Sequence, residues 1–440
     1  MLARAFGEVP RSEAALTIDV RAVMSEARNV PDEELKTLRR STQKVLPDGT
    51  LKALPQQEEY TLFDESVYVC SHTHLNDGVV KKTQISVWSG NSASQSAVEH
   101  AQTVARKLAR EGGSLPVLTV TQGHEDTTFL QSVGGILVTR RGSRTGASKQ
   151  YMLCGRKHLG HITFDEVDFG VDSLCSGFAY LVSFPVTLQQ TRLYLWKGAA
   201  CSTEEISAAR LAAMDLSETG DIIEVDHGAE FSSFLKVFGP GTTKASIPKS
   251  TSDLWRQKGA AGDRFTVRLY RIQEAEQKVG LFAYMLSRRP SWNSKPPSRS
   301  PSRDGSEIKA EAKNISPFTQ SDFEAEGIYV LDAYSELYVL IGPLFASLVE
   351  TTRNALLAQA LLYTSEYAKV CDEDGARTGP VQAHVVFRGV PHDPKRLFRQ
   401  WDDGRGLWGT AGLMAGSRGP GGNDITVIKL YEVLKAVCRG

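Results

Sequence analysis

The chain has 440 residues, which is too long for one ordinary core and suits about three domains of roughly 100–150 residues each. It has 51 basic and 51 acidic residues, so its formal net charge is zero and gives no global attraction to nucleic acid. No apolar run approaches the roughly 20 residues that a bilayer crossing needs, and the N-terminal apolar stretch is too short for a signal peptide. We therefore expect a cytosolic protein whose six widely spaced cysteines stay reduced.

The first predicted unit covers residues 56–145 and follows an N-terminal extension over residues 1–55. Alternating apolar residues predict strands in SVYVCSH and in ISVWSG, which ends at Gly90. A third strand and a short helix marked by phenylalanine lie in VLTVTQGHEDTTFLQSVGG. The helix predicted over residues 94–110 has apolar residues at three- and four-residue spacing, namely Ala97, Ala101, Val104, Ala105 and Leu108.

The same order of strand, strand, helix, strand and short helix recurs twice. A second unit over residues 146–240 contains FAYLVSF, LYLWKG and DIIEVDHGAEFSSFLKVFG. After a linker over residues 241–262, a third unit over residues 263–403 contains IYVLDAY, LYVLIG and HVVFRGVPHDPKRLFRQWDD. We predict an α+β fold in which each unit places a mixed sheet between a long and a short helix. Trp88, Trp196 and Leu340 should then lie in equivalent surroundings.

Two segments interrupt or follow these units. Residues 287–306, within the third unit, are rich in Pro, Ser and Arg and are predicted to be a disordered insertion. This insertion is either a solvated loop or a tether that phosphorylation can tune. Residues 404–440 form a glycine-rich tail with an amphipathic helix near its end, which either docks on the body of the protein or binds a partner.

The three ordered copies, over about residues 60–402, resemble gelsolin-like repeats of the gelsolin/villin family, and the N-terminal LKTLRRSTQKVLPDGTL is similar to the filamentous-fungal branch. The resemblance implies a non-enzymatic protein of the cytoplasm and cytoskeleton that binds actin as filament or monomer. Binding to filament sides, capping of barbed ends and severing are the activities it implies. An alternative is a scaffold, vesicle-coat-like or membrane-peripheral, that uses the same modules for protein–protein contacts without actin.

The long helix of the first unit is the candidate actin contact. The resemblance implies that it inserts into an apolar cleft of actin, a helix-in-groove mode. The same side chains could instead cover only the sheet of their own unit. The candidate contacts are Val98, Ala101, Thr103, Val104 and Leu108.

A basic stretch lies between Asp126 and Asp165, where no acidic residue occurs. Uncompensated cations would give a positive field suited to an acidic actin surface or to phosphoinositide head groups. The family binds both at this junction, and the GRK of residues 155–157 matches its motif; the other interpretation is a solvated basic linker. The candidate residues are Arg140, Arg141, Arg144, Lys149, Arg156 and Lys157.

Calcium sites of the family use a Gly-Asp before the first strand and a glutamate in the long helix, because calcium takes hard oxygen ligands. The first unit has Glu65-Ser66 and Ala97 at these places, so both carboxylates are missing. We expect no required cofactor and binding that depends on calcium weakly or not at all. The positions left for residual sites are Gly177 and Glu205 in the second unit and Glu326 and Glu350 in the third.

Overall fold

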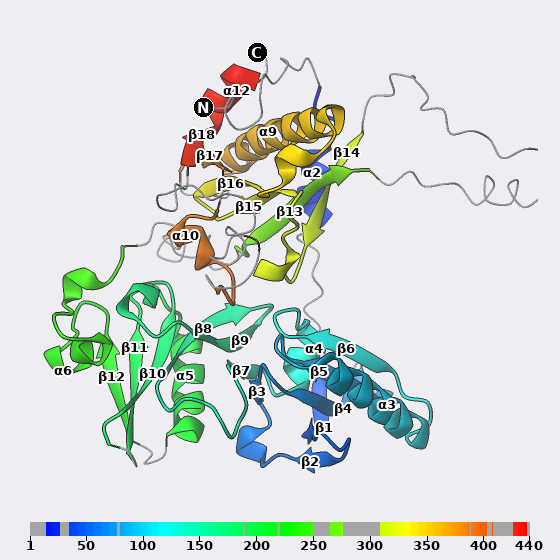
Figure 1. Ribbon diagram of the computed structural model, residues 1–440, viewed down its shortest axis with the longest axis vertical. Coiled ribbons are helices and arrows are strands. Elements are labelled where there is room, and N and C mark those ends of the chain that lie inside the picture. The colour runs from blue at the N-terminus through cyan, green and yellow to red at the C-terminus, as the bar shows by residue number, and fades with distance from the viewer. Residues whose placement is uncertain are drawn as a thin grey trace, which may run out of the picture.

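The computed structural model contains three β-sheets (Figure 1). Each sheet carries the same core of four strands, in which the first three pair antiparallel and the fourth runs parallel to the third. The structure describes residues 15–26, 35–76, 80–187, 190–217, 221–249, 265–275, 309–375, 377, 379–387, 389–402, 407 and 426–437.

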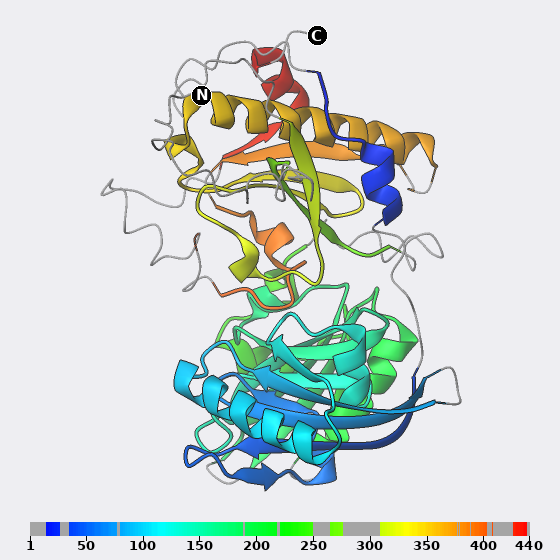
Figure 2. The same ribbon diagram turned by 90° about the vertical axis from the view of Figure 1, so that its right-hand side faces the viewer.

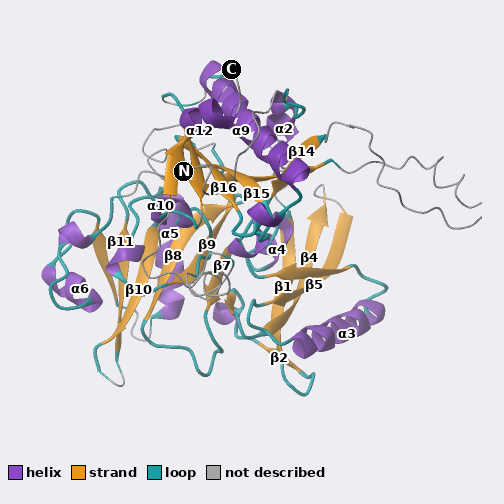
Figure 3. Ribbon diagram, turned by 45° about the horizontal axis from the view of Figure 1, so that its top comes forward, coloured by secondary structure: helices purple, strands orange, loops and turns teal. Residues whose placement is uncertain are grey.

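The first sheet has the strand order β2-β1-β4-β5-β6. Helices α3 (Gln95–Glu111) and α4 (Thr127–Ser132) cover its two faces, and Figure 3 shows α3 beside the strands of this sheet. Alternation along each strand divides the core: Val69 and Val87 pack under α3, whereas Tyr68 and Trp88 pack under α4. The strands are β1 (Lys36–Val45), β2 (Leu51–Ala53), β4 (Val67–Asn76), β5 (Val80–Ser89) and β6 (Val117–Thr121).

The second sheet has seven strands in the order β12-β11-β10-β8-β9-β7-β3. Helices α5 (Thr203–Leu216) and α6 (Ser232–Leu235) lie on its opposite faces, each over its own buried cluster. The strands are β3 (Thr61–Phe63), β7 (Ile136–Arg140), β8 (Tyr151–His158), β9 (His161–Val167), β10 (Ala179–Pro185), β11 (Thr191–Lys197) and β12 (Ile222–Asp226).

The third sheet has the order β14-β13-β15-β16-β17-β18. Its long helix is α9 (Glu350–Glu373) and its short helix is α10 (His392–Lys395). The strands are β13 (Arg268–Glu274), β14 (Ala310–Ile315), β15 (Ile328–Asp332), β16 (Glu336–Ile341), β17 (Gln382–Phe387) and β18 (Thr426–Lys429). Single-turn 3-10 segments are η1 (Gln56–Glu58), η2 (Val171–Ser173), η3 (Lys236–Phe238), η4 (Lys244–Ser246), η6 (Gln320–Asp322) and η7 (Phe345–Ser347).

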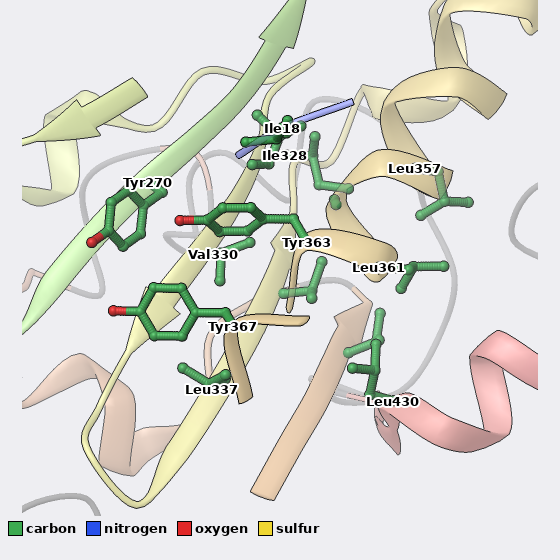
Figure 4. Close-up of a cluster of buried hydrophobic side chains, with 14 of the residues drawn as sticks. Ile18, Tyr270, Ile328, Val330, Leu337, Leu357, Leu361, Tyr363, Tyr367 and Leu430 are labelled. Atoms are coloured by element: carbon green, nitrogen blue, oxygen red, sulfur yellow. The ribbon is translucent and has the colours of Figure 1, made fainter. Parts of the chain in front are cut away.

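Helix α9 is covered by both ends of the chain. The helices α2 (Val20–Glu26) and α12 (Leu430–Val437) both pack against it, as Figure 2 shows. Ile18 and Leu430, from these two ends, join one cluster with Tyr270 and Tyr363 (Figure 4). Six consecutive α9 residues from Leu356 to Leu361 are buried, which is more than one turn of 3.6 residues, so this part of the helix is covered on every side.

The threefold recurrence and the predicted α+β architecture are confirmed. Trp88, Trp196 and Leu340 occupy one register position: each pairs across an antiparallel ladder with a tyrosine and, on its other side, with a valine of the parallel strand. These partners are Tyr68 and Val120, Tyr180 and Val225, and Tyr329 and Val386.

The glycine that directly follows β5, β11 and β16 in the three units has a steric cause. A Cβ added to Gly90, Gly198 or Gly342 would lie 2.1, 2.4 or 2.4 Å from a backbone carbonyl oxygen, which is too close for any side chain. In each unit this oxygen belongs to the residue four positions before the tyrosine of β4, β10 or β15: Asp64, Ser176 and Ala325. The recurrence of glycine therefore records one repeated close approach of two backbones.

Several expected boundaries differ from the structure. The described parts of the expected extension over residues 1–55 belong to the units, because β1 lies in the first sheet and α2 packs on the third unit. Strands β3 and β7, expected in the first unit, extend the second sheet. Residues 404–440 likewise contribute β18 and α12 to the third unit. The insertion over residues 287–306 and most of the 241–262 linker lie outside the described residues, and the remaining boundaries stay predictions.

Candidate functional site

The outward face of α3 is mostly polar. The helix begins where the Ser94 hydroxyl accepts a hydrogen bond from the Ala97 N–H, and Ala101 is 0% exposed beneath it, against its own sheet. Ala101 is therefore wrong as a surface contact. Val98 and Leu108 are half-buried and pack on the same cluster, so they cover their own sheet at least in part.

One of the five α3 candidates is exposed: Thr103, whose hydroxyl donates to the Glu99 carbonyl at 3.0 Å. Val104 is intermediate in exposure, like Val98 and Leu108. Other exposed positions on the helix are charged or polar, such as Glu99 and Arg106. Helix α3 thus offers a mostly polar surface, with a narrow row of partly buried apolar side chains.

Helix α5 presents a larger apolar surface that the sequence analysis missed. Its inner side consists of Ala208, Ala209, Ala212 and Ala213, whose small side chains let the helix lie close to the second sheet. Leu211 and Met214, on the outer side, are 57% and 63% exposed. With Ser207 and Arg210 they have helical spacing, and we call these four residues the α5 face. The signal available from sequence was the run of alanines opposite two large apolar side chains.

A cavity of about 450 Å³ borders the α5 face and the carboxyl ends of β11 and β12. Its two cations are already paired. Lys197 Nζ lies 2.9 Å from carboxylate oxygens of both Glu224 and Asp226, and Arg210 donates two hydrogen bonds to Glu224. Hydrogen bonds from Arg210 and Lys197 lower the pKa of Glu224 to about 2. The cavity is therefore a polar hollow beside the α5 face, with its main charges compensated.

The basic stretch does not form one uncompensated patch. Arg140 is buried, donates to Glu166 at 2.6 Å and stacks its guanidinium 3.5 Å from the centre of the Tyr151 ring. Arg156 is also buried and donates to the backbone carbonyls of Arg396 and Phe398. These two residues are structural, so the prediction of a six-residue surface patch is wrong.

The other four cations lie nearer the surface. Arg141 pairs with Asp168 at 2.6 Å, Arg144 with Glu58 at 2.5 Å and Lys157 with Glu204 at 2.7 Å, while Lys149 is exposed. The carboxylates come from segments outside residues 126–165, which is why the local sequence indicated no compensation.

The candidate calcium-site residues do not form a cluster of metal ligands. Glu205 is fully buried, where its carboxylate accepts hydrogen bonds from the backbone N–H of Ser202 and of Lys157, so it caps α5. Gly177 brings no carboxylate, and Glu326 and Glu350 are exposed, the latter as the first residue of α9. Over the described part of the chain, no group of three His, Cys, Asp or Glu side chains is placed to hold a metal ion.

The three units meet at Arg399. This third-unit guanidinium donates to Glu125 of the first unit at 2.6 Å and to both oxygens of Asp165 of the second at 3.0 Å. Burial alone would raise the pKa of Asp165, but Arg399 outweighs it and the pKa is lowered. A second link joins His124 to Asp322 at 3.0 Å. A cavity of about 280 Å³ lies beside this junction.

Two families match parts of the chain. Residues 310–378 match the gelsolin repeat, and residues 41–141 match a domain of unknown function (DUF7904). Gelsolin of Drosophila melanogaster is 23% identical over 386 residues, an alignment that covers 85% of this chain and 41% of the fly protein. The chain therefore spans less than half the length of this curated relative.

Two solved structures are similar to parts of the chain. The Thorarchaeota 2DGel3/rabbit actin complex is 14% identical, covering 46% of this chain and 100% of that chain with a TM-score of 0.18. The Thorarchaeota ProGel/rabbit actin complex is 20% identical, covering 22% of this chain and 100% of that chain with a TM-score of 0.18.

Among the described helices, none combines the length and apolar character needed to cross a membrane. The three units repeat one register of strands and one pair of covering helices. The third unit matches the gelsolin repeat, and the chain is similar along most of its length to fly gelsolin.

Proposed function

We propose that this chain binds actin filaments as a cytoskeletal regulator, through the outer sides of α3 and α5. The observation that carries the proposal is the α5 face, where Leu211 and Met214 are more than half exposed although the alanines on the inner side of the helix are buried against its sheet. Burying two such side chains in an apolar cleft would contribute roughly 1.5–3 kcal/mol each. Actin is the proposed partner because the chain is similar to gelsolin and the resemblance of its three units to gelsolin-like repeats implies actin binding.

The comparison of the three long helices supports this choice. Helix α9 is enclosed by α2 and α12, so it has no apolar side left for a groove. Helices α3 and α5 have no such cover among the described residues. The first two units are therefore the ones that can place a helix on a partner.

Filament-side binding and barbed-end capping are the finer activities that we propose. Two separate helix faces on neighbouring units support two contacts on one filament, and severing would require both to act together. Phosphoinositide binding has weaker support, because Arg140 and Arg156 are buried and most of the remaining cations are paired with carboxylates. Calcium is not needed for contacts of this kind.

Co-sedimentation with actin filaments in the presence of a calcium chelator tests the proposal. The wild-type chain should pellet with filaments, and the double variant Leu211→Asp/Met214→Asp should lose at least about tenfold in affinity, which corresponds to about 1.4 kcal/mol. Val186→Asp, another exposed apolar residue of the second unit, is the matched control and should bind as the wild type.

Two results would contradict the proposal. Absence of pelleting above background at every calcium concentration would favour the scaffold without actin. Unchanged pelleting of the double variant would show that the α5 face is not the contact. A pyrene-actin depolymerisation assay then separates capping, which slows loss of subunits from barbed ends, from simple side binding.

A further inference from the structure

The outer edge of the parallel strand that ends each repeated core differs among the three units. In the third unit β17 is not the last strand, because β18 pairs with it antiparallel, from His384 opposite Lys429 to Phe387 opposite Thr426. Among the described strands of the other two sheets, the equivalent strands β6 and β12 are terminal. The third unit therefore shows that this edge of the repeat can accept one more strand.

The edge of β12 is protected by charge. Glu224 and Asp226 lie on the strand and are held by Lys197 and Arg210. Charged side chains on an edge strand oppose pairing with another chain, since an incoming strand would have to displace these ion pairs. The second unit is thus a poor acceptor.

The edge of β6 has no such protection. Its sequence is Val-Leu-Thr-Val-Thr, which carries no charge and consists mostly of β-branched residues. Leu118 is 38% exposed, and Thr119 and Thr121 are exposed. Exposed, uncharged and β-prone edges of this kind pair readily with an added strand.

The register shows which backbone groups are free to pair. The Pro116 carbonyl accepts from the Ile85 N–H, and the Gln122 N–H donates to the Ser89 carbonyl, so even-numbered residues of this segment turn their backbone groups toward β5. The odd-numbered residues Val117, Thr119 and Thr121 consequently turn theirs toward the outer edge.

An apolar rim borders the beginning of this edge. Leu108 from α3, Leu115 and Val117 are partly buried and pack on the cluster beneath α3. The exposed Leu118 lies on the opposite side of the strand, because neighbouring side chains alternate. An added strand would therefore find an apolar contact for side chains on each of its faces.

We propose that the outer edge of β6 binds an extended peptide segment of a partner protein by antiparallel strand addition. The segment would alternate β-branched or apolar residues, as Thr426-Val427-Ile428-Lys429 does in β18. A second copy of this chain fits less well, because a five-residue edge buries far less than the roughly 1,200 Å² of a stable interface. Main-chain hydrogen bonds give a single peptide its affinity, and alternate side chains give it selectivity.

The test uses the full chain and a fluorescent synthetic peptide with the sequence of residues 423–430, followed by fluorescence anisotropy. Thr119→Pro removes one outward N–H but leaves the pairing with β5 intact, and should weaken binding at least tenfold. Thr119→Val keeps that N–H and should bind as the wild type. Leu118→Lys, a second variant that charges the edge, should also weaken binding.

Equal binding of the peptide by the wild type, Thr119→Pro and Leu118→Lys would overturn the proposal. This is also the result expected if the peptide only takes the place of β18 in the third unit. A concentration-dependent dimer that light scattering detects in the wild type and not in Thr119→Pro would also overturn it, in favour of a second copy as occupant. Urea unfolding of each variant shows whether a loss of binding is instead a loss of fold. If Thr119→Pro is unfolded, Leu118→Lys decides alone.

Discussion

Arg399 of the third unit and Asp165 of the second form a two-bond ion pair, with Nε and Nη2 each 3.0 Å from a carboxylate oxygen. Both residues are buried, and the third guanidinium nitrogen donates to Glu125 of the first unit. Glu125 in turn accepts hydrogen bonds from Trp88 Nε1 and the Gly123 N–H. Through Glu125, the Arg399 side chain therefore connects Trp88, at the register position shared by the three units, to the second and third units.

Replacing Arg399 by Met should destabilise the protein by about 3–5 kcal/mol, because it leaves two buried carboxylates without their cation. Urea unfolding followed by tryptophan fluorescence measures this loss. Arg141→Met is the matched control: its pair with Asp168 is exposed, and pairs of that kind contribute about 0–1 kcal/mol. Equal stability of the two variants would contradict the role given to Arg399.

Adding one methyl group to the repeated glycines should be costly. Gly90→Ala, Gly198→Ala and Gly342→Ala each force a Cβ against a backbone carbonyl, which should cost roughly 1–3 kcal/mol or more. Gly170→Ala is the control, since it has an extended φ of −175° and open space around an added Cβ. Thermal unfolding of the four variants checks the prediction, and a neutral effect at any of the three repeated positions would count against the shared geometry.

Acid should weaken the first unit through His72. Burial, with His74 and Arg40 nearby, lowers the pKa of His72 to about 4. A base with a lowered folded pKa contributes stability that is fully present above its unfolded pKa of about 6.5 and is lost as pH falls toward 4. The urea concentration at the unfolding midpoint should therefore decrease as the pH is lowered from 6.5 to 4. His72→Gln should make that decrease smaller. His100→Gln, at an exposed position, should leave the wild-type slope unchanged; an identical slope in His72→Gln would refute the assignment.

The stability contributed by the pair of His124 and Asp322 should depend on pH in the opposite direction. The hydrogen bond to Asp322 raises the pKa of His124, so its contribution is present below about pH 6.5 and is lost as pH rises through the raised value. The melting temperature of the wild type should thus decrease toward alkaline pH by an amount that His124→Gln removes. An alkaline decrease in His124→Gln at least as steep as in the wild type would show that this bridge does not hold the junction.

Much of the fold was predictable because it repeats. Strand alternation and the closing glycines at Gly90, Gly198 and Gly342 identified the three units, and the structure shows the backbone contact that preserves those glycines. Strand β1 was missed because KTLRRSTQKV is largely polar and little of it is buried. Strand β18 has only four residues and follows a glycine-rich stretch, so its pairing with β17 had no local signal.

The candidate site was less predictable, for two physical reasons. Helical periodicity gives the spacing of a face but not which face meets the sheet, so Ala101 was placed outward although it is buried. Charge compensation depends on residues distant in the chain: Glu58 and Glu204 neutralise Arg144 and Lys157 from outside the basic stretch. The α5 face emerged only when the position of the helix on its sheet was known.

Hydrogen exchange of the full chain, measured with and without saturating actin filaments, tests the central claim most directly. Filaments should slow amide exchange in α5 and α3 and leave the enclosed middle of α9 unchanged. Slowed exchange confined to α9, or no difference in any of the three long helices, would contradict filament binding through the first two units.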